Sequence, residues 1–321
     1  MRYRPLGTSG LMVSAICLGG NSWGAAGRRA WGAFGPEESR VFFKAALDAG
    51  INFFDTADTY NAGMSESIIG AELLSMVSRD EVVIGTKVGI AIADRPNHGG
   101  IGRKHILASI DRQLKRLRTD YIDLYQLHRI DDVTPTEEVL ATLTDLVRAG
   151  KVRHLGASTM PAWRFADLAA TARAKGLEPF ISMQNLYNLI AREEEQEMIP
   201  ACRHYGVGLI PYSPLARGFL AGNRDPQGGA TERARTDLIA RRQQYSAVDW
   251  ATAAAVVEAA AAYGCSPVQI ALAWLFSKPQ VVAPVMGATR PEQIAEAAGA
   301  VALTLDDATI AALESPRAQA S

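Results

Sequence analysis

Three short apolar segments of the sequence each lead into polar residues whose types suit acid–base catalysis. FFDTADTY contains Asp55 and Tyr60, VVIGTK ends at Lys87, and YIDLYQLH ends at His128. If these segments are neighbouring parallel strands of a barrel, their C-terminal ends meet at one face. The carboxylate, phenol, amine and imidazole would then converge, which their spacing in the sequence alone cannot achieve.

Together, the four groups match the needs of a general acid. The unperturbed pKa of a phenol, about 10, makes it a poor proton donor at neutral pH unless its anion is stabilised. The ammonium of Lys87 can favour the phenolate of Tyr60, and the carboxylate of Asp55 can hold that ammonium in place. His128 can donate a hydrogen bond to a substrate oxygen. Such a site could protonate an oxyanion forming on a carbonyl group, and it contains no acyl-transfer nucleophile and no metal-ligand set.

Each residue also has an ordinary structural interpretation. An aspartate after a strand is commonly a helix N-cap, a single tyrosine is commonly part of the core, and a single lysine commonly lies at the surface. Four suitable residue types at the ends of three consecutive strands favour the catalytic interpretation, which the geometry must test.

Strand and helix patterns alternate along the chain. After a hairpin in YRPLGTSGLMVS and an apolar run at 16–19 come the strand-like segments INFF, VVIGTK, YIDLYQLH, VRHLGAS, FISMQ, VGLIPY and VVAPVMG. Helices are expected at 65–76, 103–117 and 136–149, the last one ending before Gly150. The alternation predicts an α/β fold, a (β/α)8 TIM barrel with an N-terminal β-hairpin and extra helices, in one domain spanning residues 1–321.

Composition argues against several classes of protein. With 48% hydrophobic residues, 21% charged residues and a net charge of −1, the chain has no field that favours nucleic acid or an anionic membrane. Cys17, Cys202 and Cys265 form no C-x-x-C pair, which is typical of thiols in a reducing compartment. The N-terminus lacks the apolar segment of a secretory signal, and the Ala-rich stretch 250–263 is too short to span a membrane. We therefore expect a cytoplasmic protein without nucleic-acid or membrane partners.

The segments GINFFDTADTY, GTK, DYIDLYQLH, GAS, SMQNLYN, PYSPLARG and GATRPEQI resemble, in order, those of the aldo-keto reductase superfamily over nearly the whole chain. The chain is most similar to its bacterial and fungal aryl-alcohol-dehydrogenase-like branches. The resemblance implies an NADP(H)-dependent oxidoreductase that reduces aldehydes or ketones to alcohols, or runs in reverse. It assigns Asp55, Tyr60, Lys87 and His128 as a catalytic tetrad, with Tyr60 as the proton donor and the hydride coming from NADPH.

The cofactor site follows from the same resemblance. No G-x-G-x-x-G follows a strand, so a Rossmann-type dinucleotide site is unsupported. Ser158 and Gln184 are expected to hold the nicotinamide carboxamide, Tyr212 to stack on its ring, and Arg290 to pair with an adenosine 2′-phosphate at a helix start. The complete implied set is Gly20, Asn21, Asp55, Ser158, Thr159, Gln184, Tyr212, Ser213, Pro214, Leu215, Ala216, Arg217, Gly218, Gly287, Thr289, Arg290, Gln293 and Glu296.

Two positions depart from the family pattern. Thr159 stands where much of the family has asparagine after the serine of the fifth strand, and Ala297 stands where many members have asparagine. The first leaves one carboxamide contact uncertain, and the second removes an adenine contact. Neither position belongs to the tetrad.

Two long connections would lie at the catalytic end of the barrel, where loops are usually functional. The first, 21–35, carries Trp23, Trp31 and Phe34. Its tryptophans, with Tyr60 and His128, either bind an aromatic or otherwise planar substrate or pack the loop onto the barrel. The second, 217–246, suggests the hypothesis that part of it folds over the cofactor phosphates, because it holds the arginines Arg217, Arg224, Arg233, Arg235, Arg241 and Arg242.

Two other functions compete with carbonyl reduction. One is an NADP(H)-binding, redox-sensing auxiliary subunit with little turnover, like the branch of the superfamily that associates with potassium channels. His128 argues against it, because a complete tetrad serves turnover. The other is a lyase or aldolase that uses Lys87 as a Schiff-base nucleophile, which Asp55 would oppose by keeping the lysine charged. The physiological substrate and the oligomeric state are not encoded in any of these motifs.

Overall fold

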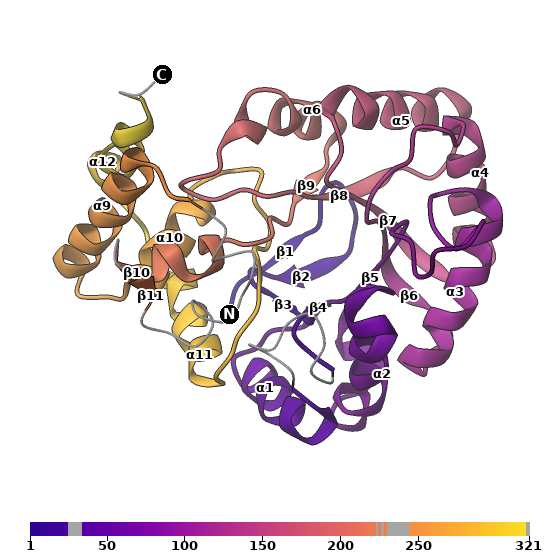
Figure 1. The fold of residues 1–321 in the computed structure, drawn as a ribbon, viewed down its shortest axis with the longest axis horizontal. Coiled ribbons are helices and arrows are strands. Elements are labelled where there is room, and N and C mark those ends of the chain that lie inside the picture. Colours follow the sequence, from indigo (N-terminus) through magenta and orange to yellow (C-terminus); the bar gives the residue numbers. More distant parts are fainter. Residues whose placement is uncertain (25–33, 223, 226–227, 230–243, 319–321) are drawn as a thin grey trace.

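The strands predicted from the sequence form one parallel sheet (Figure 1). The computed structural model describes residues 1–24, 34–222, 224–225, 228–229 and 244–318, and in it eight strands pair in the order β12-β3-β4-β5-β6-β7-β8-β9. The strands are β3 (Cys17–Gly19), β4 (Phe53–Asp55), β5 (Val83–Val88), β6 (Ile122–Leu127), β7 (Val152–Ser158), β8 (Phe180–Gln184), β9 (Gly208–Leu209) and β12 (Val285–Met286).

The sheet closes on itself between its two terminal strands. Parallel bridges join Leu209 to Val281 and Tyr212 to Val285, and the amide of Val285 donates to the carbonyl of Pro211 over 2.8 Å. This closure confirms the predicted (β/α)8 barrel. β9 and β12 have two residues each, fewer than VGLIPY and VVAPVMG suggested, because a proline in each segment has no N–H for the ladder.

Helices surround the strands in Figure 1. The helices are α1 (Pro36–Asp48), α2 (Met64–Ala71), α3 (Arg103–Leu117), α4 (Thr136–Arg148), α5 (Ala162–Lys175), α6 (Met198–Tyr205), α9 (Ala247–Tyr263), α10 (Pro267–Phe276), α11 (Glu292–Gly299) and α12 (Asp307–Ala318). α3 has the predicted bounds, and α4 ends just before Gly150, whose φ of +72° suits glycine. The helix expected at 65–76 instead ends at Ala71 and continues as a short 3-10 turn, Leu73–Ser75.

The predicted N-terminal hairpin covers one end of the barrel. β1 (Tyr3–Pro5) and β2 (Met12–Ser14) pair antiparallel. Leu6 and Val13 from the hairpin pack in one apolar cluster with Cys17 and Phe53, which lie near the N-terminal ends of β3 and β4. The turn approaches the barrel closely at Gly7, where φ is +58° and a Cβ atom would lie 2.4 Å from a backbone carbonyl oxygen. The hairpin thus fills the end of the barrel opposite the C-terminal ends of the strands.

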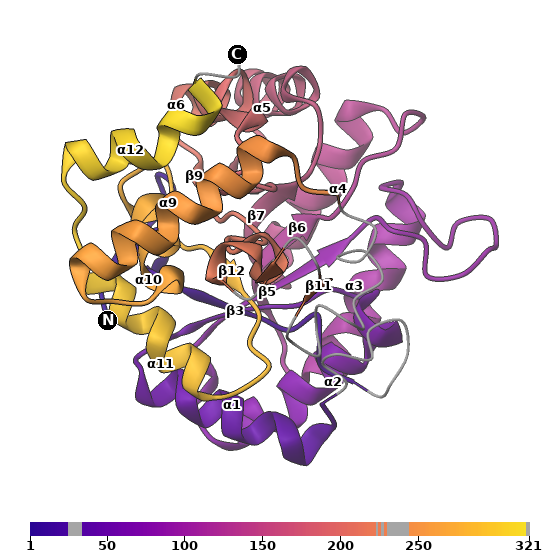
Figure 2. The ribbon, with the colours of Figure 1, turned by 60° about the vertical axis from the view of Figure 1, so that its left-hand side comes forward.

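The last helices gather on one side of the barrel, with α9 and α12 side by side (Figure 2). Within the described ranges no single helix is long and apolar enough to cross a membrane, and α9 and α10 pass that test only together, across a bend of 98°. In the second long connection, β10 (Arg224–Asp225) pairs antiparallel with β11 (Gly228–Gly229). Five of the residues singled out in the two connections lie outside the described residues, namely Trp31, Arg233, Arg235, Arg241 and Arg242.

Candidate active site

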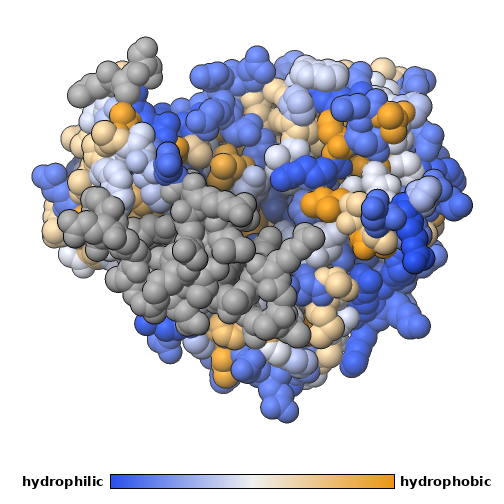
Figure 3. Space-filling model, viewed as in Figure 1, coloured by the Kyte–Doolittle hydropathy of each residue, from blue (hydrophilic) through white to orange (hydrophobic). Residues whose placement is uncertain are grey.

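The four acid–base residues lie at the C-terminal ends of three adjacent strands. Asp55 is the last residue of β4, Lys87 lies near the end of β5, and His128 directly follows β6. Tyr60 begins the 3-10 turn Tyr60–Gly63, which comes after β4. Because β4, β5 and β6 are neighbours in the sheet, the four groups meet as predicted. Figure 3 shows a recess with hydrophilic side chains near the centre of the molecular face seen in Figure 1.

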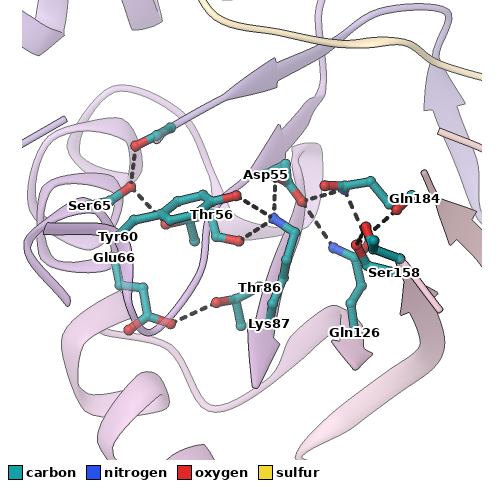
Figure 4. A network of polar contacts seen from close by, with 12 residues as sticks. Asp55, Thr56, Tyr60, Ser65, Glu66, Thr86, Lys87, Gln126, Ser158 and Gln184 are labelled. Carbon is teal, nitrogen blue, oxygen red and sulfur yellow. Dashed lines mark hydrogen bonds and ion pairs between the residues drawn. The ribbon is translucent and has the colours of Figure 1, made fainter. Parts of the chain in front are cut away.

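The ammonium of Lys87 occupies the centre of the site (Figure 4). This fully buried side chain donates to Asp55 Oδ2 over 2.5 Å, to the carbonyl of Thr56 over 2.8 Å and to the hydroxyl oxygen of Tyr60 over 3.3 Å. These three acceptors match its three N–H bonds. Burial lowers the pKa of Lys87, but the charge of Asp55, followed by that of Tyr60 and the hydrogen bonds to both, outweighs burial and raises the pKa overall. Lys87 is therefore held as a cation.

The turn that carries Tyr60 has an unusual backbone. Asn61 and Ala62 have φ values of +47° and +55°, a region that residues other than glycine seldom adopt and that is enriched at functional sites. The side-chain amide of Asn61 donates to the carbonyl of Trp23 over 2.6 Å, which ties the turn to the first loop. The rings of Tyr60 and His128 meet edge to face with centroids 5.7 Å apart. The phenol and imidazole therefore flank the same small space.

A buried polar layer lies behind β5. Glu66, fully buried on α2, accepts hydrogen bonds from Thr86 over 2.7 Å, from Gln113 over 2.9 Å and from Arg116 over 3.0 Å. Gln113 also donates to the backbone carbonyl of Lys87 over 3.0 Å. This layer joins α2 and α3 to the strand that carries Lys87, and the sequence did not predict it.

The residues expected to hold the carboxamide adjoin Asp55. Ser158 ends β7 and Gln184 ends β8, and the hydroxyl of Ser158 donates to the carbonyl of Gln184 over 2.8 Å. The side-chain amide of Gln184 donates to Asp55 Oδ1 over 3.0 Å. Thr159 has a φ of +37°, and its amide donates to the side chain of Asn185 over 2.9 Å. The implied cofactor residues and the tetrad are thus parts of one connected group.

The segment after β9 forms a loop with several left-handed residues. Ser213, Ala216 and Arg217 have φ values of +54°, +47° and +58°, and Gly218 has +89°. Backbone segments with left-handed residues can form concave sites for anions. In this loop the amides of Ala216 and Gly218 donate to the carbonyls of Ser213 and Leu215, over 2.9 Å each. Asn188 donates from its side-chain amide to the carbonyl of Ser213 over 2.9 Å and so holds the loop. The partly exposed members of the predicted set here are Tyr212, Ser213, Leu215, Arg217 and Gly218, while Pro214 and Ala216 are buried.

The segment expected to receive the adenosine phosphate lies at the start of α11. Gly287 and Arg290 are exposed there, and Thr289 and Glu296 are half-buried. Gln293 accepts with Oε1 from the amide of Thr289 over 2.8 Å and from that of Arg290 over 3.2 Å. Its side-chain oxygen therefore holds the segment that leads into its own helix, a role the sequence did not predict. Ala297, one of the two positions that depart from the family pattern, is fully buried.

The described start of the first loop, up to Gly24, packs onto the barrel. Gly20 follows β3, and its amide donates to the carbonyl of Asp55 over 2.7 Å. Trp23 is 1% exposed, and its ring contacts that of Phe43 in α1 with centroids 4.5 Å apart. A Cβ atom on Gly20 would lie 2.7 Å from the Trp23 ring. Trp23 therefore packs against the barrel and does not line an open pocket. Asn21 beside it is half-buried.

Sequence reasoning overlooked Gln126. This fully buried residue of β6 donates from Nε2 to Asp55 Oδ1 over 2.9 Å. The strand period of two places it on the same side of β6 as His128, and that signal was available in YIDLYQLH. No such signal marked Asn188, because the carbonyl that it hydrogen-bonds, that of Ser213, lies on a different loop.

The sequence profile of the Aldo/keto reductase family matches residues 15–317 of the chain. The chain belongs to this family. It is 41% identical to the versiconal hemiacetal acetate reductase of Aspergillus parasiticus over 98% of this chain and 97% of that protein. It is also similar to proteins named as aryl-alcohol dehydrogenases, one of Schizosaccharomyces pombe (40% identical, over 98% of this chain and 95% of that protein) and one of Saccharomyces cerevisiae (35%, over 97% and 95%).

Family membership makes the chain an oxidoreductase for small-molecule carbonyl or alcohol substrates, in a family that generally uses NAD(P)H. The fungal aryl-alcohol-dehydrogenase-like relatives confirm the predicted branch. These relatives carry names of reductases and dehydrogenases, and none of these names describes an auxiliary subunit.

Proposed function

We propose that the chain reduces aldehydes or ketones to alcohols with NADPH and that Tyr60 is the proton donor. The observation that carries this proposal is the hydrogen bond from Lys87 to the hydroxyl oxygen of Tyr60, with Asp55 bound to the same ammonium. A cation at this distance favours the phenolate that remains after the proton has left. His128, edge-on to Tyr60, is suitably placed to donate to the same substrate oxygen.

The cofactor would supply a hydride to the carbonyl carbon when bound. Tyr60 then transfers its proton to the carbonyl oxygen, and Lys87 stabilises the phenolate without moving, because Asp55 and Thr56 hold its ammonium. In the direction of alcohol oxidation, the phenolate of Tyr60 takes the proton back. The buried position of Lys87 keeps water from weakening its effect on Tyr60.

The described residues are arranged to suit NADPH bound in an extended conformation. Ser158 and Gln184, at neighbouring strand ends beside Asp55, would hold the carboxamide, and Tyr212 would stack on the nicotinamide. Ser213, Leu215 and Arg217 of the left-handed loop would line the pyrophosphate, whereas the amides of Ala216 and Gly218 donate to backbone carbonyls within the loop. Arg290, exposed before α11, would pair with the 2′-phosphate and so favour NADPH over NADH.

The lyase alternative finds no support in this geometry. A Schiff base requires a neutral amine, whereas Lys87 meets three acceptors and its pKa is raised. We also propose that the chain works in the cytoplasm as one domain. Its three cysteines are free, and Cys17 and Cys202 are buried, which suits a reducing compartment.

Incubation with NADPH and an aromatic aldehyde, followed by NADPH absorbance, tests the proposal. An aromatic aldehyde is chosen because two relatives are named as aryl-alcohol dehydrogenases. We expect NADPH consumption that depends on the aldehyde. Binding of NADPH without consumption would indicate the redox sensor, and indifference to the cofactor would indicate the lyase.

A further inference from the structure

Gln126 occupies a space on β6 that its neighbours leave open for it. In the sheet it lies between Lys87 of β5 and Gly156 of β7. A Cβ atom on Gly156 would lie 2.8 Å from Gln126 Cγ, and one on Gly85 would lie 3.3 Å from its Nε2. Two glycines on the flanking strands therefore make room for this long polar side chain inside the barrel.

The amide of Gln126 completes the hydrogen bonding of Asp55 (Figure 4). Oδ2 of Asp55 accepts from Lys87, while Oδ1 accepts from Gln126 over 2.9 Å and from Gln184 over 3.0 Å. Buried ion pairs are stable only when further hydrogen bonds satisfy the remaining lone pairs. Neutral amide donors do this for Asp55 without adding a second cation that would compete with Lys87.

Asp55 also determines which way the two amides point. An ionised carboxylate only accepts hydrogen bonds, so Gln126 must present Nε2 to it and turn Oε1 away. That Oε1 accepts from Nε2 of Gln184 over 3.3 Å. Both N–H bonds of Gln184 are then directed at Asp55 and Gln126, and its Oε1 is the end of the amide that can receive a hydrogen bond from a ligand.

We propose that Gln126 is a positioning residue for catalysis. It keeps the Asp55–Lys87 pair ionised, so that Lys87 presents its full charge to Tyr60, and it orients Gln184 to present a carbonyl oxygen to the carboxamide N–H2 of the cofactor. This role rests on the proposed function. It also explains why a fully buried, hydrogen-bonded glutamine stands where an apolar residue would fill the barrel more simply.

The test compares Gln126→Met with Gln113→Met. Both substitutions remove a fully buried amide that makes several hydrogen bonds. Gln113 contacts Lys87 only through the backbone carbonyl of that residue, and it contacts neither the Lys87 ammonium nor Asp55. For Gln126→Met we expect the rising limb of the pH–rate profile of alcohol oxidation to move up by about 0.5–1 pH unit, because Lys87 would stabilise negative charge on the Tyr60 oxygen less well. We expect NADP⁺ binding, measured by fluorescence titration, to weaken about fivefold, the scale of one hydrogen bond. Gln113→Met should lose stability but keep the wild-type limb.

A second variant covers the possibility that Gln126→Met does not fold. Gly85→Ala adds a methyl group 3.3 Å from Gln126 Nε2 and should move the limb in the same direction by a smaller amount. A folded Gln126→Met or Gly85→Ala protein with the wild-type limb and wild-type NADP⁺ affinity would overturn the role of Gln126. Absence of turnover in the wild type, or normal turnover in Tyr60→Phe, would instead overturn the proposed function itself.

Discussion

The ammonium of Lys87 and the hydroxyl oxygen of Tyr60 are 3.3 Å apart and hydrogen-bonded, although Tyr60 follows β4, Lys87 lies on β5 and α2 separates the two in the chain. Asp55 and Thr56 also hold the ammonium, so it cannot move away from Tyr60 during a reaction. The cation is therefore in place before any charge develops on the phenol. Such preorganisation stabilises a transition state without a reorganisation cost at the moment of reaction.

Replacing Tyr60 with phenylalanine keeps the ring and its edge contact with His128 but removes the proton. We expect NADPH affinity close to that of the wild type and a turnover loss of at least ~100-fold, the scale of a positioned general acid. Steady-state kinetics and a cofactor titration check this. Tyr263→Phe is the matched control. Among the described residues the hydroxyl of Tyr263 hydrogen-bonds only to Asp306 and Thr309, so its removal should leave turnover unchanged. Near-normal turnover in Tyr60→Phe would remove Tyr60 from the mechanism.

Lys87→Met should abolish turnover, because it removes the cation that stabilises the phenolate. It also leaves Asp55 buried without its partner, so we expect a loss of about 3–5 kcal/mol in the free energy of unfolding. Activity must therefore be compared only where near-ultraviolet circular dichroism shows a folded protein.

Borohydride trapping of the wild type with a carbonyl substrate gives an independent test that requires no variant. We expect no adduct on Lys87 in a peptide mass map, because its ammonium is protonated and occupied by three acceptors. A covalent adduct there would favour the lyase.

Local patterns in the sequence were sufficient to predict the barrel. The apolar runs that lead into Asp55, Lys87 and His128 each became a strand with that residue at or next to its C-terminal end. The stripe of α3 and the stop at Gly150 likewise depend on neighbours in the chain, and both were predicted correctly. The convergence of Asp55, Tyr60, Lys87 and His128 could be predicted because parallel strands bring such ends together whatever the intervening sequence.

Contacts between distant elements could not be predicted in the same way. Glu66 reads as one polar residue of a helix, and only the packing of α2 against α3 brings it to Gln113 and Arg116. Trp23 could have lined a pocket, and its burial against Phe43 depends on how α1 lies on the barrel. These outcomes depend on tertiary packing, which residue type and spacing do not specify.

Arg290→Ala tests discrimination between the cofactors. The side chain is exposed, so we expect the variant to fold normally. NADPH binding should weaken by about 1–3 kcal/mol, the scale of a charge-assisted hydrogen bond, and NADH binding should hardly change. Arg173→Ala, an exposed arginine of α5, is the control and should affect neither cofactor. Equal losses for NADPH and NADH would show that Arg290 does not recognise the 2′-phosphate.

Asp58 is a buried acid between Asp55 and Tyr60 that takes no part in the proposed proton transfer. It is 2% exposed, and within the described part of the chain its carboxylate approaches the backbone amide of Thr59 without forming a hydrogen bond of regular geometry. Burial, and then the charge of Glu66, raises its pKa to about 7, while Arg116, the backbone of Thr59 and Arg112 act in the opposite direction. The folded protein therefore keeps this carboxyl group protonated at pH values at which the unfolded chain has released the proton.

Asp58 should make the folded protein less stable as the pH rises. An unfolded aspartate titrates near ~4, so between about pH 4 and 7 the folded state binds more protons, and the free energy of unfolding falls across that window by at most about 4 kcal/mol. Asp58→Asn, which is neutral at every pH, should match the wild type in urea unfolding at pH 4.5 (roughly the lower end of the window) and exceed its stability near ~8. Asp94→Asn, at an exposed loop position, should follow the wild type at both pH values. Parallel pH dependence in the wild type and Asp58→Asn would mean that Asp58 is ionised in the folded protein throughout, and that a partner compensates its charge.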